Sequence, residues 1–156
     1  MKLVIVDDDG LICSSLARSL IRLGHAARAA TSEESALRLV DSESPNALLT
    51  DLDLGGGGDG IELIQRLRRE GRRIPTVLMT GSDPYMARAR LARAGLDDVA
   101  LLEKPFAFED LMTLLAALLV PGEAAQARPA PGRTTRRTPI SVVVETLARS
   151  LGGRVV

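Results

Sequence analysis

Residues 47–60 read ALLTDLDLGGGGDG, and this stretch decides the fold. A short apolar run ends on Asp51, a second carboxylate follows at Asp53, and four glycines and an Asp-Gly pair come before a helical pattern. Such a pattern is typical of a buried strand that delivers a carboxylate to a glycine-rich loop. Buried strands of open α/β sheets present their chemistry at their carboxyl ends, so we expect the functional site around Asp51.

Four further segments surround this stretch and repeat its order of apolar strand followed by helix. The other predicted strands cover residues 2–6 (KLVIV), 25–30 (HAARAA), 76–80 (TVLMT) and 99–102 (VALL). Each is followed by apolar residues at helical spacing, and Thr31 and Glu34 have the spacing of a capping box for the second helix. Five β-α units predict an α/β fold, a doubly wound parallel sheet of five strands with helices on both faces.

Composition indicates one domain with a short C-terminal extension. The chain has 156 residues and 46% apolar content, enough for one ordinary core. Residues 1–120 carry 14 basic and 18 acidic side chains (14 − 18 = −4), whereas the last 36 carry 6 and 2 (6 − 2 = +4). Residues 121–139 contain four prolines and are predicted to be a flexible linker.

Residues 140–156 are predicted to form a short amphipathic helix or tail. Its apolar positions fall on one helical face: Ile140, Val143, Val144, Leu147 and Leu151. A helix of about 12 residues is marginal alone in water and needs a partner surface. We expect this segment to form a homodimer or to dock another protein.

Several function classes are not favoured by the composition. Cys13 is the only cysteine, so no intrachain disulfide can form, and a cytoplasmic location is expected. No apolar run approaches the length of a membrane span, and no signal peptide is recognised. The weakly acidic body does not favour direct binding of nucleic acid.

The predicted strand ends bring together a set of residues with one chemistry. Asp7, Asp8 and Asp51 are carboxylates, Thr80 is a hydroxyl and Lys104 is an ammonium. Carboxylates in close contact repel by about 4 kcal/mol per pair at an effective dielectric of 20, unless a cation or proton intervenes. A bound Mg²⁺ would relieve this repulsion. Carboxylates that bind Mg²⁺ beside a hydroxyl and a lysine are typical of a phosphoryl-transfer site, in which we expect Asp51 to be the nucleophile.

These residues resemble the receiver domains of two-component response regulators of the chemotaxis-regulator type. The resemblance covers residues 1–120 and lies in four motifs, LVIVDD, LLTDLDL, VLMTG and EKPF, in the family's order and at about its spacing. It implies a flavodoxin-like sheet in the order 2-1-3-4-5. It also implies phosphorylation of the acceptor aspartate by a histidine kinase or phosphotransfer protein, with output through an unknown downstream protein.

The resemblance also implies roles for individual residues. Mg²⁺ would be bound by Asp8, Asp51 and the main-chain carbonyl of Asp53, with Asp7 helping through water. Thr80 would shift toward the phosphoryl group. The peptide bond between Lys104 and Pro105 would be cis. The residues two positions beyond the acceptor and the threonine, Asp53 and Ser82, would tune the lifetime of the phosphoryl group.

Three departures from the family pattern are visible. Gly55 replaces the usual proline, and Asp59 lies eight rather than seven residues after the acceptor, which indicates a one-residue insertion within the glycines. Leu101 stands where an aromatic switch residue is expected, and Gly81 stands where alanine is commoner. The chemistry therefore looks intact, while the read-out differs from the usual one.

Three alternatives remain open at this stage. Asp51-Leu52-Asp53 imitates the D-x-D motif of haloacid-dehalogenase-type phosphatases, although that motif closes the first strand and this one closes the third. Calcium binding by GGGGDG is a less supported alternative, because no repeat and no further acidic residues accompany this segment. A degenerate receiver that acts as a phosphorylation-independent interaction module is the third alternative.

Overall fold

A computed structural model of the protein describes residues 1–119. The elements alternate strictly between strand and helix: β1 (Lys2–Val6), α1 (Gly10–Arg22), β2 (Ala26–Ala30), α2 (Glu33–Glu43), β3 (Ala47–Asp51), α3 (Gly60–Arg69), β4 (Thr76–Thr80), α4 (Pro84–Arg93), β5 (Ala100–Glu103) and α5 (Phe108–Leu119). The predicted linker over 121–139 and the predicted helix over 140–156 lie outside the described residues.

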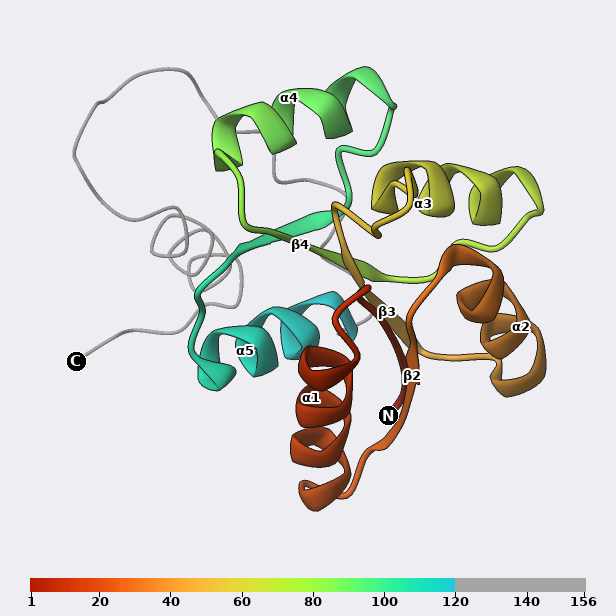
Figure 1. Ribbon diagram of the computed structural model, residues 1–156, viewed down its shortest axis with the longest axis vertical. Helices are drawn as coiled ribbons and strands as arrows, with labels where there is room; N and C mark the ends of the chain where they lie inside the picture. Colours follow the sequence, from red (N-terminus) through yellow and green to blue (C-terminus); the bar gives the residue numbers. More distant parts are fainter. Residues whose placement is uncertain (120–156) are drawn as a thin grey trace.

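The five strands form one parallel sheet in the order β2-β1-β3-β4-β5. Figure 1 shows α1 and α5 on one face of this sheet and α2, α3 and α4 on the other. The predicted fold class and strand order are therefore confirmed. The predicted bounds differ from the observed ones by one or two residues at several ends, as at β5, where the strand begins at Ala100 rather than at residue 99.

Two apolar layers form the core, one on each face of the sheet. Alternate residues of β1 serve different layers, so that Leu3 and Ile5 contact α1 and α5, whereas Val4 and Val6 contact the α2, α3 and α4 side. The strands β3 and β4 are buried at every position. Covering on both faces explains why these strands are continuous apolar runs rather than alternating ones.

Aspartate side chains start three of the five helices. Asp9, Asp59 and Asp83 are the N-caps of α1, α3 and α4, and each accepts a hydrogen bond from a main-chain N–H of the first turn. The N-cap of α2 is Ser32, one residue later than the predicted cap at Thr31. Ser35 supplies the reciprocal bond there, so Thr31 and Glu34 do not cap the helix. The prediction was wrong because the Ser32 and Ser35 hydroxyls form the reciprocal bonds of the capping box, while the Glu34 carboxylate pairs with Arg38.

Among residues 1–119, none of the helices has both the length and the apolar character needed to cross a bilayer.

Gly60 brings the start of α3 against the end of β3. A Cβ at this position would lie 2.1 Å from the Asp51 main-chain oxygen and 3.0 Å from a Leu78 methyl carbon. The Gly60 N–H also donates to the Leu52 carbonyl over 2.9 Å. A residue without a side chain is therefore needed for α3 to approach the carboxylate-bearing strand end.

Gly60→Ala is expected to lower the free energy of unfolding by about 1–3 kcal/mol, because the new methyl group overpacks against main chain that cannot move aside. Urea unfolding followed by circular dichroism measures this loss. Gly81→Ala is the matched control, because a Cβ at Gly81 meets no atom within 4 Å, and its free energy of unfolding should stay within about 0.5 kcal/mol of wild type. Equal stability of the two variants would contradict the packing argument.

Candidate functional site

The candidate site lies at the edge of the sheet where the strands end. Because the strands are parallel, their carboxyl ends share one edge, and four of them carry the residues singled out from the sequence. Asp7 and Asp8 follow β1, Asp51 is the last residue of β3, Thr80 is the last of β4, and Lys104 follows β5.

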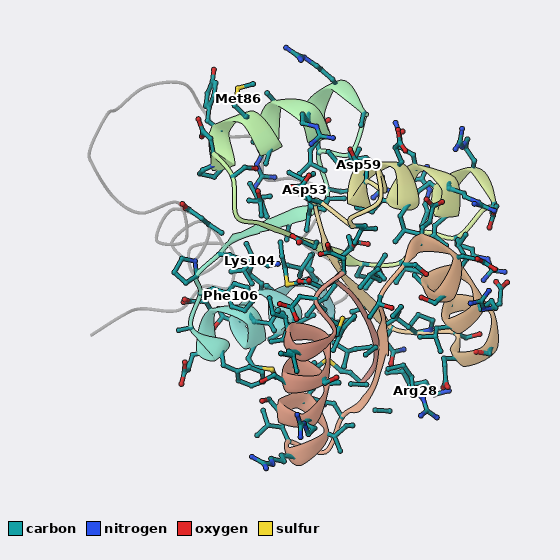
Figure 2. The ribbon with its side chains drawn as sticks, in the orientation of Figure 1. Arg28, Asp53, Asp59, Met86, Lys104 and Phe106 are labelled. Atoms are coloured by element: carbon teal, nitrogen blue, oxygen red, sulfur yellow. The ribbon has the colours of Figure 1, made fainter. Side chains whose placement is uncertain are left out.

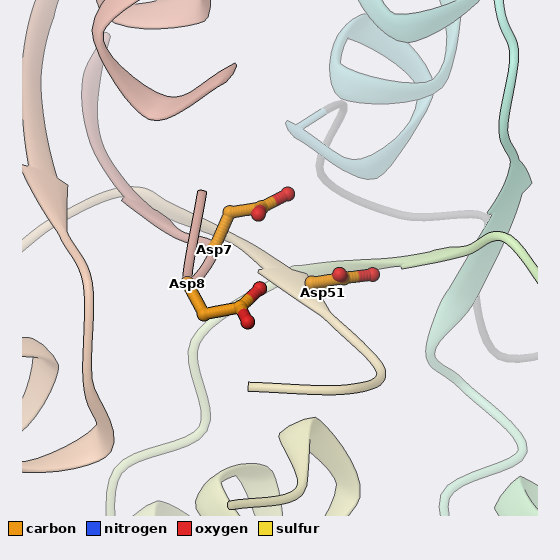
Figure 3. Close-up of side chains that lie close together, drawn as sticks. All are labelled: Asp7, Asp8 and Asp51. Carbon is orange, nitrogen blue, oxygen red and sulfur yellow. The ribbon is translucent and has the colours of Figure 1, made fainter. Parts of the chain in front are cut away.

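Three carboxylates converge at this edge. One oxygen from each of Asp7, Asp8 and Asp51 can be chosen so that all three lie within 4.8 Å of one another. We call these residues the acidic cluster, and Figure 3 shows their side chains close together at the strand ends. Asp7 is buried, Asp51 is only 9% exposed, and Asp8 faces solvent, so the cluster is open on one side.

Asp7 is fixed by contacts to both of its oxygens. The Asp9 N–H donates to its Oδ1 over 2.9 Å, and the Lys104 Nζ donates to its Oδ2 over 2.7 Å. Cys13 packs behind it, with Sγ 3.5 Å from the Asp7 main-chain oxygen. Burial, and after it the charge of Asp7, raises the pKa of the Cys13 thiol to about 11, so this cysteine stays protonated at neutral pH as a core side chain.

The Asp51 carboxylate is held but not neutralised. The Leu52 N–H donates to its Oδ1 over 2.9 Å, and the Lys104 Nζ lies 3.1 Å from its Oδ2. Burial raises the pKa of Asp51, and the lysine only partly counters this effect. The folded protein therefore disfavours the ionised form of Asp51 when no cation is bound.

Lys104 is shared between two carboxylates. Burial by itself lowers the pKa of its ammonium, but the hydrogen bonds to Asp7 and Asp51 and the charges of these carboxylates together outweigh burial, and the net shift is upward. The pKa values of Lys104 and Asp51 both shift upward, whereas in a simple ion pair the carboxyl pKa would fall. Burial is the first cause of the upward shift of the Asp51 pKa, and Lys104, whose Nζ lies 2.7 Å from Asp7 and 3.1 Å from Asp51, counters it only in part.

The main chain around Lys104 is also constrained. Its N–H donates to the Thr80 carbonyl over 2.7 Å, which aligns the ends of β4 and β5. The bond between Lys104 and Pro105 is cis, the geometry that the resemblance implies.

The Thr80 hydroxyl is occupied by Ser82 in this structure. Its Oγ1 lies 2.9 Å from the Ser82 hydroxyl and accepts a bond from the Ser82 N–H over 3.1 Å. Any movement of Thr80 toward Asp51 must therefore exchange these bonds for new ones. Sequence reasoning placed Ser82 near the site but did not find this contact.

The carboxylate of Asp53 does not belong to the acidic cluster, and it is exposed. Figure 2 shows Asp53 and Asp59 near the start of α3, where their main chains form an isolated antiparallel bridge. Sequence reasoning also missed the ion pair between Asp59 and Arg90 of α4. These two residues are 31 positions apart, and no local pattern marks their contact.

The donor set fits a hard divalent cation. Its side-chain atoms are all carboxylate oxygens, two of the three carboxylates are largely buried, and their mutual repulsion is only partly relieved by Lys104. Mg²⁺ prefers such oxygen ligands together with water, which the open side at Asp8 can supply.

Comparison with known proteins shows that the part of the chain that contains the candidate site is similar to response regulators. The family model of the response regulator receiver domain matches residues 3–116. Response regulator MprA of Mycobacterium avium (strain 104) is 36% identical over 119 residues, covering 76% of this chain and 51% of that protein. MprA of Mycobacterium leprae (strain TN) is 36% identical over 129 residues, covering 81% and 55%. The chain thus spans about half the length of these curated relatives.

Solved structures give the same result for the fold. The BeF3-activated N-terminal receiver domain of RstA from Klebsiella pneumoniae superposes with a TM-score of 0.68 at 25% identity, covering 76% of this chain and 98% of that one. The receiver domain of NtrX from Brucella abortus gives 0.67 at 26% identity, covering 76% and 98%. Because the family match spans most of the chain and includes every strand end described above, the protein belongs to the response regulator receiver domain family of two-component signalling.

Proposed function

We propose that this protein accepts a phosphoryl group on Asp51 from a histidine kinase or phosphotransfer protein in the cytoplasm, and signals through phosphorylation-dependent protein contacts. The observation that carries the proposal is the acidic cluster, whose oxygens lie within 4.8 Å of one another while Lys104 stands 3.1 Å from Asp51. Family membership adds support, because the matched region contains all of these residues.

In the proposed reaction a carboxylate oxygen of Asp51 attacks the phosphorus of a phosphohistidine. The new O–P bond forms while the P–N bond breaks, and the histidine nitrogen keeps the electron pair. Asp51 is suited to this role because its Oδ1 is oriented by the Leu52 N–H at 2.9 Å and its surroundings raise its pKa, which indicates an incompletely compensated carboxylate. The product is an acyl phosphate on Asp51.

We propose that Mg²⁺ is bound by Asp8, Asp51 and the main-chain carbonyl of Asp53, with Asp7 acting through water. The ion would supply positive charge against the carboxylates and the phosphoryl oxygens. Asp7 also fixes Lys104 by the 2.7 Å bond, and the ammonium can bind a phosphoryl oxygen as a point charge.

Thr80 would bind a further phosphoryl oxygen through its hydroxyl. Its bonds to Ser82 must then be exchanged, so Ser82 is suited to influence the lifetime of the phosphoryl group. Asp53, exposed beside the site, is suited to the same role.

We favour a phosphoacceptor signalling protein over an enzyme. The haloacid-dehalogenase alternative needs both acids of Asp51-Leu52-Asp53 in the site, and only the first belongs to the acidic cluster.

A degenerate, phosphorylation-independent receiver is the second candidate. It is favoured by Leu101, an aliphatic residue packed against the α2, α3 and α4 layer where the family has an aromatic switch residue. The net charge of −4 over residues 1–120 (14 − 18) supports a protein partner over nucleic acid.

For the remaining residues we propose that 121–139 are a linker and that 140–156 dimerise or dock a partner. The apolar spacing within 140–156 supports this proposal.

Incubation with acetyl phosphate and Mg²⁺ should add one phosphoryl group to the protein, because the buried Asp51 carboxylate is the nucleophile. Intact-mass spectrometry measures the gain, and Asp51→Asn is the matched control that should show none. Steady turnover of a small phosphate ester would instead support the phosphatase. A folded protein that binds Mg²⁺ but gains no mass from any donor would support the degenerate receiver.

Asp51→Asn should raise the free energy of unfolding in EDTA at neutral pH, because the amide carries no charge to desolvate. Since burial raises the pKa of Asp51 in the folded state, the stabilising effect of its protonation is present at low pH and is lost as the pH rises through that pKa. The advantage of the variant should therefore shrink on acidification. Urea unfolding between acidic and neutral pH measures it.

The same unfolding experiment with Mg²⁺ should reverse the order. At ten times its dissociation constant the ion should stabilise wild type by about 1.4 kcal/mol and the variant by less, since the variant lacks one ligand charge. An Asp51→Asn variant that is less stable than wild type in EDTA at neutral pH would contradict the electrostatic reading of the site.

Removal of residues 121–156 should abolish dimerisation or partner binding while leaving the phosphorylation of Asp51 intact. Sedimentation and pull-down with the cognate partner measure the first effect, and intact mass measures the second. If oligomeric state and partner binding are both unchanged, the proposed role of the tail is wrong.

A further inference from the structure

One carboxylate, that of Asp59, joins the helices α3 and α4. Its Oδ1 accepts the Ile61 N–H over 2.7 Å and so caps α3, while its Oδ2 forms an ion pair with Arg90 of α4. The side chains of Asp59 and Arg90 are 22% and 40% exposed, so the pair is partly shielded from water. This contact is an addition to the cap, because capping uses only one of the two oxygens.

Asp59 also closes the loop that follows the phosphoacceptor strand. The main chains of Asp53 and Asp59 form a bridge, and inside it the Leu54 N–H donates to the Gly58 carbonyl over 3.0 Å. We call residues 53–59 the glycine loop. A displacement of Asp59 therefore displaces Asp53, two residues from Asp51, through main-chain bonds.

The opposite side of the glycine loop touches the acidic cluster. A Cβ at Gly55 would lie 2.6 Å from the Asp8 Oδ2, so the loop main chain lies directly against this carboxylate. The loop is thus placed between Asp8 on one side and Arg90, through Asp59, on the other.

The glycine loop has few side chains to hold it. Gly55, Gly56 and Gly57 all have positive φ, of 64°, 55° and 87°, and contribute no side-chain contacts. Leu54 is the buried apolar anchor, and within residues 1–119 the pair with Arg90 is the one salt bridge that reaches the loop. Much of the loop's position should therefore depend on that pair.

We propose that Arg90 is a positioning residue, which through Asp59 holds the glycine loop against Asp8 and so sets the affinity of the acidic cluster for Mg²⁺. The inference rests on the proposed function, since it concerns the same cation. Coupling between sites is reciprocal, so occupancy of the cluster should in turn stabilise the contact of the loop with α4.

Isothermal titration calorimetry with Mg²⁺ tests the inference. Arg90→Gln and Asp59→Asn should each weaken binding by about 3–10-fold, the range expected for coupled contacts, and the double variant should be no weaker than the single ones. Asp59→Asn is chosen because asparagine keeps the helix cap and removes only the charge. Arg90→Lys should recover part of the lost affinity.

Arg68→Gln is the matched control. Arg68 on α3 also pairs between elements, with Asp98 at 2.7 Å, but this pair does not reach the glycine loop. Its loss should change the Mg²⁺ affinity by less than about twofold while costing a similar, small amount of stability. A purely structural role of Arg90 would give the same result for both arginine variants.

Hydrogen exchange gives a second readout that needs no phosphorylation. In wild type, Mg²⁺ should slow exchange at the amides of residues 53–59 and of α4, and in Arg90→Gln the slowing at α4 should be lost. Normal Mg²⁺ binding by Arg90→Gln, or additive losses in the double variant, would overturn the inference and leave the proposed function standing. Failure of wild type to bind Mg²⁺ would overturn both.

Discussion

The site depends on the close approach of carboxylates at the ends of β1 and β3, with one ammonium between them. The Lys104 Nζ lies 2.7 Å from Asp7 and 3.1 Å from Asp51, so a single positive charge faces two carboxylates. Burial raises the pKa of Asp51, and Lys104 offsets this effect only in part. A carboxylate whose position is fixed and whose negative charge is only partly balanced is stabilised in its ionised form by a bound cation.

The rest of the fold keeps these charges at one edge. Two apolar layers clamp the sheet from both faces, so the strand ends cannot spread apart to relieve the repulsion. Gly60 lets α3 start directly against the main chain of Asp51. Burial of apolar surface elsewhere in the domain therefore offsets the unfavourable free energy of bringing these carboxylates together.

The glycine loop contacts both the acidic cluster and, through Asp59, the helix α4. Its main chain touches Asp8 and is tied to α4 through Asp59 and Arg90. The loop therefore links the acidic cluster to α4, while Leu101 packs as an aliphatic side chain against the layer formed by α2, α3 and α4. These contacts connect the strand ends to α4 without an aromatic side chain.

The sequence by itself determined the order of the elements, the strand order through its family motifs, and the placement of the strand-end aspartates, Thr80 and Lys104 at one edge of the sheet, because each of these residues follows a buried apolar run. Local detail was less secure, as the choice of Ser32 over Thr31 as N-cap shows. Only the tertiary structure decided how Lys104 is shared, that Thr80 is bonded to Ser82, and that Asp59 meets Arg90. The reason is physical: periodicity reports which face of an element is buried, whereas contacts between polar side chains of different elements depend on how those elements pack.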